Sequence, residues 1–269
     1  MKENRTVESA DGTHIAYVRQ GSGPPLIQVD GALCYYEQGP SAALADHLKE
    51  SFTVFSYDRR GRGGSGDTPP YSVEKEVDDI AALVAEAGGR ANLYGISSGA
   101  VLALEAASRL EGIEKVAVYE APFIVDDTRP PLGDDYVDGL RRHLQAGHHS
   151  AAVRHFMRAV EVPTAVTYLM ALMPAWKKMV AIAPTLLYDA AVMGDTQAGK
   201  ALPADRWSVV EVPTLVMAGG KSPEWMRFGQ AALAAVLPNA RHRVLEGQTH
   251  LLEPGAVAPV LVDFFLEAA

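Results

Sequence analysis

Short apolar runs alternate with stretches of helical periodicity through most of this chain, and this alternation constrains its fold more than any other feature. The expected strands are 25–29, 52–57, 91–94, 115–119, 213–218 and 242–245. The expected helices are 41–50, 100–110, 224–237, 257–266 and one that starts at residue 73 and ends at Gly88-Gly89. Strands joined by helices pair in parallel through right-handed crossovers, so the sequence predicts an α/β fold with a mostly parallel central sheet and helices on both faces. An antiparallel hairpin turning around Asp11-Gly12 is expected to precede it.

The alternation stops between residues 126 and 207, where helix-forming residues are interrupted by prolines. We therefore expect a core formed by residues 1–125 and 208–269, with 126–207 as an inserted helical cap. The cap is rich in methionine and aromatic residues, namely Met157, Met170, Met173, Met179, Met193, Trp176, Tyr168 and Tyr188. Such side chains either line an adaptable apolar pocket or form the cap's own core.

Composition narrows the class of protein. A formal net charge of −9 argues against a nucleic-acid partner, because binding to phosphates depends on clustered Lys and Arg. No apolar run is long enough to span a membrane, and no apolar leader follows the N-terminus. The single cysteine, Cys34, excludes an internal disulfide and is interpreted as a small, partly buried side chain. We expect a cytoplasmic protein with a small-molecule substrate, and the sequence leaves a homodimer open.

Residues 95–99 read Gly95-Ile96-Ser97-Ser98-Gly99, between an expected strand and an expected helix. This is the context of a nucleophile elbow, a sharp turn that lifts the serine Oγ above the sheet edge. Small residues two positions before and after the serine allow strand and helix to pack closely. The motif alone is weak, because a Gly-x-Ser-x-Gly pattern arises by chance in about one chain in ten of this composition.

A serine nucleophile needs a histidine to take its proton and a carboxylate to orient that histidine. Among the eight histidines, His250 directly follows a predicted late strand, where the site of a parallel sheet should lie. The adjacent pair His148-His149 could suggest a metal site, but no matching ligand spacing follows it. We expect no metal ion and no cofactor.

With these motifs the chain resembles the α/β-hydrolase superfamily over nearly its whole length. The matching segments are 58–65 (Asp-Arg-Arg-Gly-Arg-Gly-Gly-Ser), the elbow at 95–99, the helical insertion and His250 before the last helix. The segment 58–65 could also suggest a phosphate-binding loop, but no Gly-Lys-Ser/Thr follows it, so a structural role is the better interpretation. The resemblance implies an α/β-hydrolase fold with a serine nucleophile.

The position of the acid departs from the common family pattern. Where the family usually places Asp after the seventh strand, this chain reads Gly219-Gly220-Lys221-Ser222-Pro223. Some members, including certain haloalkane dehalogenases and zearalenone-type lactone hydrolases, instead use a Glu after the sixth strand, and Glu120 stands there. We assign Glu120 as the acid. The alternatives are Asp126, Asp127 and Glu224.

Two backbone N–H groups must stabilise the oxyanion, and the candidates are Ser98 and the turn Gly31-Ala32. The sequence thus predicts a serine hydrolase that cleaves a carboxylic ester or lactone of a small to medium apolar substrate through an acyl-enzyme. The resemblance leaves open a thioesterase, a C–C bond hydrolase, a cofactor-free peroxidase and a non-hydrolytic binding or cyclising protein.

Overall fold

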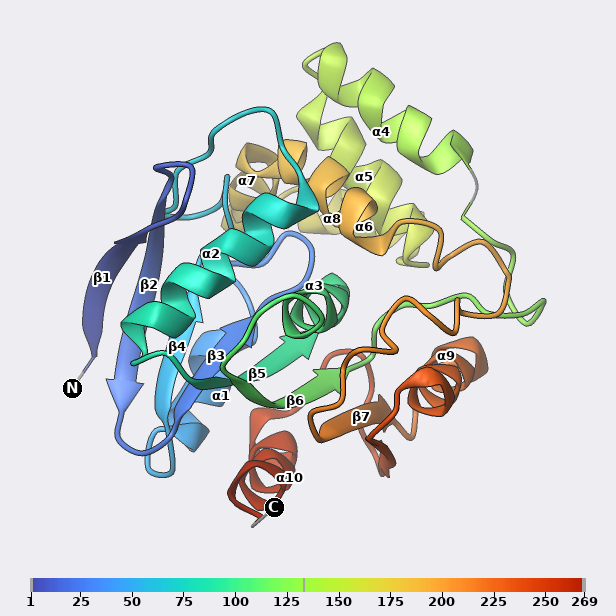
Figure 1. Cartoon of the computed structure of the whole chain (residues 1–269). Coiled ribbons are helices and arrows are strands. Elements are labelled where there is room, and N and C mark those ends of the chain that lie inside the picture. The colour runs from blue at the N-terminus through green and yellow to red at the C-terminus, as the bar shows by residue number, and fades with distance from the viewer. Residues whose placement is uncertain (1, 133, 268–269) are drawn as a thin grey trace.

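The computed structural model describes residues 2–132 and 134–267 (Figure 1). Within these ranges eight strands form one sheet in the order β1-β2-β4-β3-β5-β6-β7-β8. The strands are β1 (Glu3–Glu8), β2 (His14–Gly21), β3 (Pro25–Val29), β4 (Thr53–Tyr57), β5 (Ala91–Ile96), β6 (Ile113–Tyr119), β7 (Thr214–Gly219) and β8 (Ala240–Leu245). The hairpin β1–β2 and the pair β2–β4 are antiparallel, whereas all the other neighbours in the sheet are parallel. The predicted mostly parallel sheet is confirmed.

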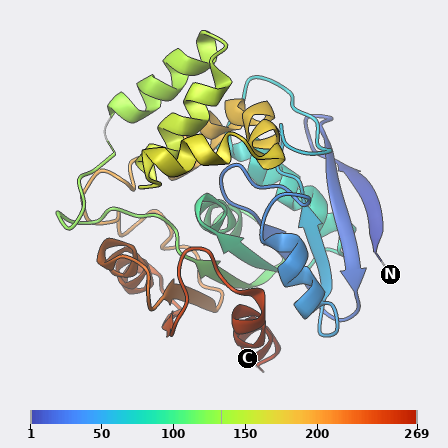
Figure 2. The ribbon, with the colours of Figure 1, turned by 180° about the vertical axis from the view of Figure 1, so that it is seen from behind.

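Helices cover both faces of this sheet (Figures 1 and 2). On one face, α1 (Ser41–Leu48) and α10 (Pro254–Leu266) share a buried apolar cluster with the strands. On the other face, α2 (Val73–Glu86), α3 (Ser98–Ala107) and α9 (Glu224–Val236) share a second cluster. Every residue of β4, β5 and β7 is buried, as expected for strands covered on both sides.

The start of helix α2 and the face that it buries both follow from its local sequence. Ser72 is its N-cap, and its side chain accepts a hydrogen bond from the Lys75 N–H. The helical spacing places Val77, Ile80 and Leu83 on one buried face against the sheet. The apolar period and the N-cap serine together specify the start and the inner face of this helix.

The helices between β6 and β7 form a separate group, which lies along the top of Figure 1, from the centre to the right. They are α4 (Asp134–Gln145), α5 (His149–Ala159), α6 (Thr164–Met170), α7 (Pro174–Ala181), the 3-10 turn η1 (Ala183–Thr185) and α8 (Leu186–Met193). Their buried cluster contains Met157, Trp176 and Met179, together with Leu33 and Tyr35 from the loop after β3. Half of the eight methionine and aromatic residues noted in the sequence therefore serve the packing of the insertion itself: Met157, Met170, Met179 and Trp176.

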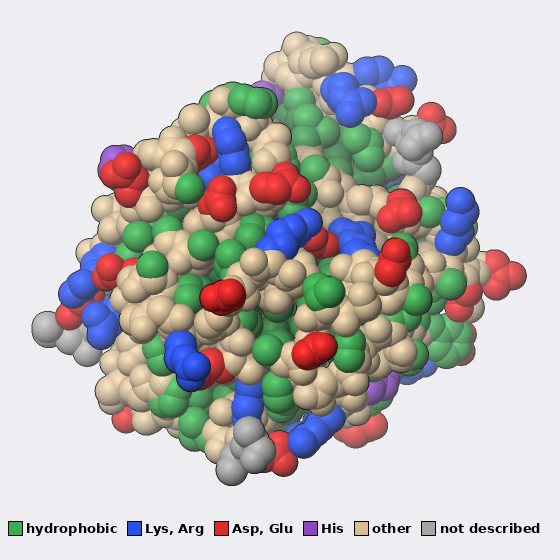
Figure 3. All heavy atoms as spheres, viewed as in Figure 1, with side chains coloured by type: hydrophobic (Ala, Val, Ile, Leu, Met, Phe, Trp, Pro, Cys, Tyr) green, Lys and Arg blue, Asp and Glu red, His purple; other side chains and the backbone are tan. Residues whose placement is uncertain are grey.

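The surface carries charges of both signs. Figure 3 shows acidic and basic side chains interspersed over the viewed face, without a large area of one sign. Across the described ranges, no helix combines the length and the apolar character that crossing a membrane would require.

Candidate active site

The turn between β5 and α3 holds Ser97 in a strained backbone conformation. Its φ of 58° and ψ of −129° lie outside the regions that a side chain other than glycine normally adopts. The Ser97 N–H donates to the Tyr119 carbonyl at 3.0 Å, and the Ser97 carbonyl accepts from the Ala100 N–H at 3.0 Å. The strand on one side and the helix on the other therefore hold the serine in this conformation.

The two glycines of the elbow are required by close packing. A Cβ atom on Gly95 would lie 2.4 Å from the Gly99 carbonyl oxygen, and one on Gly99 would lie 2.2 Å from the Val29 carbonyl oxygen. Both distances are far below van der Waals contact with backbone atoms that cannot move independently. The small residues predicted on either side of Ser97 are needed for α3 to pack against β3 and β5.

Glu120, directly after β6, is joined to His250. Its Oε2 lies 2.9 Å from His250 Nδ1, and its Oε1 accepts the Gly219 N–H at 2.7 Å. The Glu120 side chain is completely buried, and its backbone has a positive φ of 48°. The ends of β6 and β7 thus hold the carboxylate, with one oxygen bound to the sheet and the other directed at the histidine.

This hydrogen bond determines which nitrogen of His250 carries the proton. An ionised carboxylate can only accept hydrogen bonds, so Nδ1 of His250 must be the donor towards Glu120. In the neutral ring, Nε2 is then left without a proton and can accept one. This is the tautomer that a general base beside a serine requires.

The loop that carries His250 is braced from both sides. The Tyr119 hydroxyl donates to the Thr249 carbonyl at 2.6 Å. The Gln248 side chain accepts the Glu253 N–H at 2.8 Å. These bonds tie the residues before and after the histidine to the sheet and to the start of α10, and they limit its movement.

The three carboxylates that the sequence offered as alternative acids have other surroundings than Glu120. Asp126 Oδ1 accepts hydrogen bonds from the backbone and side chain of Thr128, while Asp127 and Glu224 are exposed. The described hydrogen bonds of His250 include none to these three carboxylates. The geometry favours Glu120 over the other candidates that the sequence left open.

Two N–H groups near Ser97 are available to an anion. The N–H of Ser98 is at the first position of α3, and that of Ala32 lies in the loop after β3; neither has an acceptor among the described residues. Ser97, Ser98 and Ala32 all line one cavity. Gly31 packs against the serine, since a Cβ atom there would lie 2.8 Å from Ser97 Cβ.

This cavity has a volume of about 160 Å³ and lies between the sheet and the insertion. The segments that follow β5 and β8 contribute Ser97 and His250, and the insertion contributes Tyr136, Phe156 and Met193. No hydrogen bond joins Ser97 Oγ to His250 within the described residues, but both open into this same space. Such contacts are commonly long before substrate binds.

The arginines of the turn after β4 are buried, which agrees with the predicted structural role. Arg59 binds Glu76 through two hydrogen bonds of 2.7 Å and binds Asp189 at 2.7 Å. Arg62 binds the other oxygen of Asp189 at 2.8 Å, and Ser98 Oγ donates to Asp189 at 2.7 Å. Burial alone would raise the pKa of Asp189, but the Arg62 and Arg59 guanidinium groups hold that pKa below its ordinary value.

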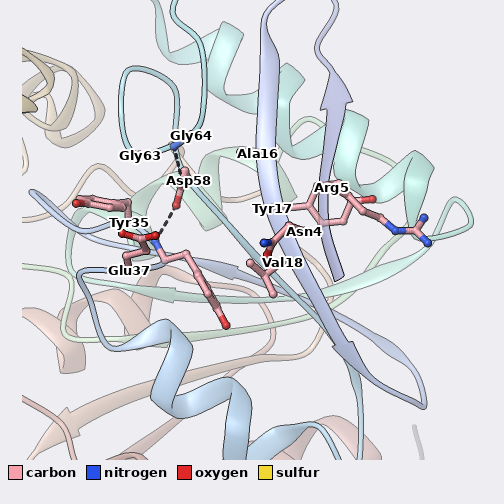
Figure 4. Close-up of a pocket in the computed structure, with 11 residues that line it drawn as sticks. Asn4, Arg5, Ala16, Tyr17, Val18, Tyr35, Glu37, Asp58, Gly63 and Gly64 are labelled. Carbon is pink, nitrogen blue, oxygen red and sulfur yellow. Dashed lines mark hydrogen bonds between the residues drawn. The ribbon is translucent and has the colours of Figure 1, made fainter. Parts of the chain in front are cut away.

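Asp58, at the start of the same turn, braces a neighbouring loop. Its carboxylate accepts the N–H groups of Tyr36 and Gly64, each at 2.7 Å, beside a shallow hollow next to β2 (Figure 4). A Cβ atom on Gly63 would lie 2.0 Å from Asp58 Oδ2, so this turn also needs glycine. The close-up shows the carboxylate directed at the backbone of the loop, which is a structural arrangement.

Other residues noted in the sequence lie outside the cavity. His148 is exposed just before α5, and the described residues contain no group of three His, Cys, Asp or Glu side chains placed to hold a metal ion. Burial raises the pKa of Cys34 to about 12, so this thiol stays protonated at neutral pH.

Sequence reasoning did not identify Asp189 or Arg129, which also line the cavity. Asp189 lies in the apolar helix α8, and a carboxylate within an apolar helix signals a buried partner. That signal was present in the sequence, but it could not identify Arg59 and Arg62 as the partners. Arg129 lies in a proline-containing loop, where no local pattern distinguishes a cavity residue from a solvated one.

Comparisons with known proteins show the family to which this fold belongs. Residues 21–260 match the model of the alpha/beta hydrolase family. The chain is similar to the crystal structure of an alpha/beta hydrolase from Sphaerobacter thermophilus, with a TM-score of 0.89 and 49% identity over 97% of this chain and 100% of that one. A thermophilic esterase from Thermogutta terrifontis shares the fold, with a TM-score of 0.72 and 19% identity over 98% of each chain.

A curated relative matches a shorter region. The uncharacterized hydrolase YraK of Bacillus subtilis is 34% identical over 133 residues, which are 46% of this chain and 47% of that protein. The match therefore spans about half the length of this relative. Because the family match extends over most of the sheet, the elbow and the insertion, this chain belongs to the alpha/beta hydrolase family.

Proposed function

We propose that this protein is a serine hydrolase that cleaves a small carboxylic ester or lactone through an acyl-enzyme. The observation that carries the proposal is the 2.9 Å contact between Glu120 and His250 at the cavity that contains Ser97. Ser97, His250 and Glu120 have the roles of nucleophile, general base and orienting acid in this mechanism.

The first half of the reaction acylates the serine. Ser97 Oγ attacks the carbonyl carbon of the substrate while its proton moves to His250 Nε2. The carbonyl oxygen becomes an anion that accepts hydrogen bonds from the N–H groups of Ser98 and Ala32. The carbonyl then reforms as the bond to the alkoxy oxygen breaks, and His250 gives its proton to that oxygen. In a lactone the new hydroxyl stays attached to the acyl group.

The second half releases the acid. A water molecule attacks the acyl carbon and gives its proton to His250, which again becomes a cation facing Glu120. The tetrahedral intermediate then expels Ser97 Oγ, which regains the proton, and the carboxylic acid leaves. No group beyond water and these side chains is needed to balance the reaction.

The cavity supports a small substrate. Its volume of about 160 Å³ is below the range of about 300–1,000 Å³ that is usual for drug-sized ligands. Apolar side chains, among them Phe156, Met193 and Met226, form much of its wall. A short acyl group fits this space better than a long-chain lipid does.

The test is the substitution Ser97→Ala combined with labelling by a fluorophosphonate. The wild type should hydrolyse short 4-nitrophenyl esters and react with the label, and Ser97→Ala should do neither while keeping the wild-type circular dichroism spectrum. Ser208→Ala, which changes an exposed serine outside the cavity, is the matched control and should behave as wild type.

A substrate panel separates this proposal from the other reactions of the fold. Acyl-CoA thioesters, β-diketones, simple lactones and 4-nitrophenyl esters are compared at equal concentrations. Preference for oxygen esters or lactones supports the proposal. An unreactive Ser97, or full hydrolysis by Ser97→Ala, would overturn it in favour of a binding protein or of a different nucleophile.

A further inference from the structure

A nearly buried arginine, Arg129, lines the cavity that contains Ser97 and His250. It comes from the loop between β6 and α4, and its side chain is only 8% exposed. Its guanidinium carbon lies 4.2 Å from the centre of the Trp225 ring, which lines the same cavity at the start of α9. Stacking of this kind covers one face of the guanidinium group and leaves its N–H edges available.

Few of these N–H groups have a protein acceptor. A guanidinium group carries five N–H donors, and the described contacts of Arg129 include one hydrogen bond, from Nη2 to the Ala159 carbonyl. Glu161 Oε1 lies 3.7 Å from Arg129 Nε, which is too far for a hydrogen bond. The nitrogen atoms of Arg129 are not among the described buried atoms that lack a partner, so its remaining donors are open to solvent.

The charge of Arg129 is also only partly balanced. Glu161 is 56% exposed, and water screens its attraction. Burial lowers the pKa of Arg129, and Glu161 opposes this effect only in part. In contrast, two other buried arginines each bind a carboxylate through two hydrogen bonds. Arg59 binds Glu76 in this way, and Arg60 binds Asp79.

The Trp225 indole, which also lines the cavity, carries a further N–H donor. Its Nε1 atom is buried and has no hydrogen-bond partner among the described residues. A buried donor without an acceptor is unfavourable unless something else supplies one. The Arg129 guanidinium group and the Trp225 indole therefore lie against each other beside the cavity, and each carries N–H groups without an acceptor among the described residues.

We propose that Arg129 binds a carboxylate of the substrate, so that this hydrolase acts on half-esters or lactones that carry a free carboxylate. The inference rests on the proposed function above and specifies its substrate class. The planar N–H edge of arginine matches the two oxygens of a carboxylate. Glu161 nearby disfavours a doubly charged phosphate more than a singly charged carboxylate, because repulsion grows with charge.

The remaining wall fits such a substrate. Leu132, Phe156 and Val160 are apolar and line the same space as Arg129. A short hydrocarbon segment can lie along them, with the ester carbonyl at Ser97 and the carboxylate at Arg129. The cavity volume of about 160 Å³ limits that segment to a few carbon atoms.

The test measures binding without turnover. Calorimetry on Ser97→Ala compares the monomethyl esters of succinate, glutarate and adipate with the corresponding dimethyl esters. At least one monomethyl ester should bind about tenfold tighter, or more, than its dimethyl ester, as expected for hydrogen bonds to a charged group. Adding Arg129→Gln should remove this difference, whereas adding Arg158→Gln, an exposed arginine outside the cavity, should preserve it.

A second variant keeps the test decisive if Arg129→Gln does not fold. Glu161→Gln removes the competing negative charge while keeping the size of the side chain, so it should tighten binding of the monomethyl esters severalfold and leave the dimethyl esters unchanged. Equal affinity for mono- and dimethyl esters at all three chain lengths would overturn the proposal. So would a preference that survives Arg129→Gln, or one that Glu161→Gln leaves unchanged.

Failure of this inference can be distinguished from failure of the proposed function. If wild-type protein hydrolyses neutral and anionic esters equally well, Arg129 does not select the substrate but Ser97 is still the nucleophile. If Ser97→Ala binds monomethyl esters through Arg129 while wild type hydrolyses none of them and resists the fluorophosphonate, carboxylate recognition holds and the hydrolytic mechanism is wrong.

Discussion

Ser98, the residue after the elbow serine, donates a hydrogen bond from its hydroxyl to Asp189 Oδ1 at 2.7 Å. Asp189 belongs to the insertion, and it also binds Arg59 and Arg62 of the turn after β4. Arg62 in turn donates to the Gly31 carbonyl at 2.6 Å. A single buried carboxylate therefore connects the insertion to both loops that present N–H groups beside Ser97.

The substitution Asp189→Asn tests this connection. It keeps the shape of the side chain but leaves Arg59 and Arg62 with less compensating charge, so we expect a loss of about 3 kcal/mol in the free energy of unfolding. If the bond to Ser98 positions the oxyanion N–H, kcat should fall with little change in KM, since the oxyanion forms only in the transition state. Urea unfolding and steady-state kinetics measure the two effects. Asp195→Asn, at an exposed position, is the control and should stay within about 0.5 kcal/mol; equal stability of the two variants would contradict the prediction.

The substitution Glu120→Gln should abolish hydrolysis by reversing the tautomer of His250. The Gly219 N–H still needs an acceptor, so the amide oxygen faces it and the NH2 group faces His250 Nδ1. Nδ1 must then accept a hydrogen bond, and Nε2 keeps the proton that it should take from Ser97. We expect kcat/KM to fall by about 10⁴-fold.

Glu224→Gln is the control for this experiment, because Glu224 is an exposed carboxylate that the sequence also offered as the acid. It should keep wild-type activity on a 4-nitrophenyl ester. If Glu224→Gln loses activity and Glu120→Gln does not, the assignment of the acid is wrong.

The substitution Gly31→Ala should impair the serine more than it impairs the fold. The added Cβ would lie 2.8 Å from Ser97 Cβ and 3.3 Å from Ser97 Oγ, and the φ of Gly31 is not in the left-handed region. The loop or the serine must shift, so we expect kcat/KM to fall by about 100-fold or more. Fluorophosphonate labelling rates and thermal melting separate the two effects. Gly66→Ala, where the nearest atom would be 3.5 Å away, is the matched control; similar labelling rates in the two variants would refute the prediction.

Stability should depend on pH through Asp30. This side chain is buried beside the cavity loop and accepts the Ser41 hydroxyl at 2.7 Å, while its Oδ2 has no partner among the described residues. Burial raises the pKa of Asp30 to about 6 from 3.8, although Ser41, Arg62 and Arg59 oppose the shift. The folded state therefore binds the proton more tightly than the unfolded state. The stabilisation is complete below about pH 4 and is lost as the pH rises through about 6.

The measurement compares wild type with Asp30→Asn, whose side chain does not titrate. The difference in unfolding free energy, wild type minus variant, should fall by about 2 kcal/mol between pH 4 and pH 7. Other titrating groups are common to both proteins and cancel in the difference. Parallel pH profiles would show that Asp30 does not titrate in this range.

Much of the fold could be predicted because its signals are local. The apolar runs predicted every strand, and the edges differ by only a few residues. For example, β6 begins at Ile113 where the run suggested 115. The helix after the elbow begins at Ser98, directly after the strained serine, and not at Ala100, because the sharp turn leads straight into helical backbone. The assignment of Glu120 needed more than periodicity, since it depended on the missing aspartate after β7.

The sequence by itself determined the sheet, the elbow and the three side chains offered for catalysis, because apolar period, turn chemistry and strand ends are properties of short segments. Only the tertiary structure decided that Asp189 closes on Arg59 and Arg62, and that Arg129 stacks on Trp225 at the cavity wall. The partners in these contacts are far apart in the chain and meet only after the insertion folds back over the sheet. A buried charge shows in the sequence that it needs a partner, but the packing of the insertion against the sheet selects which one.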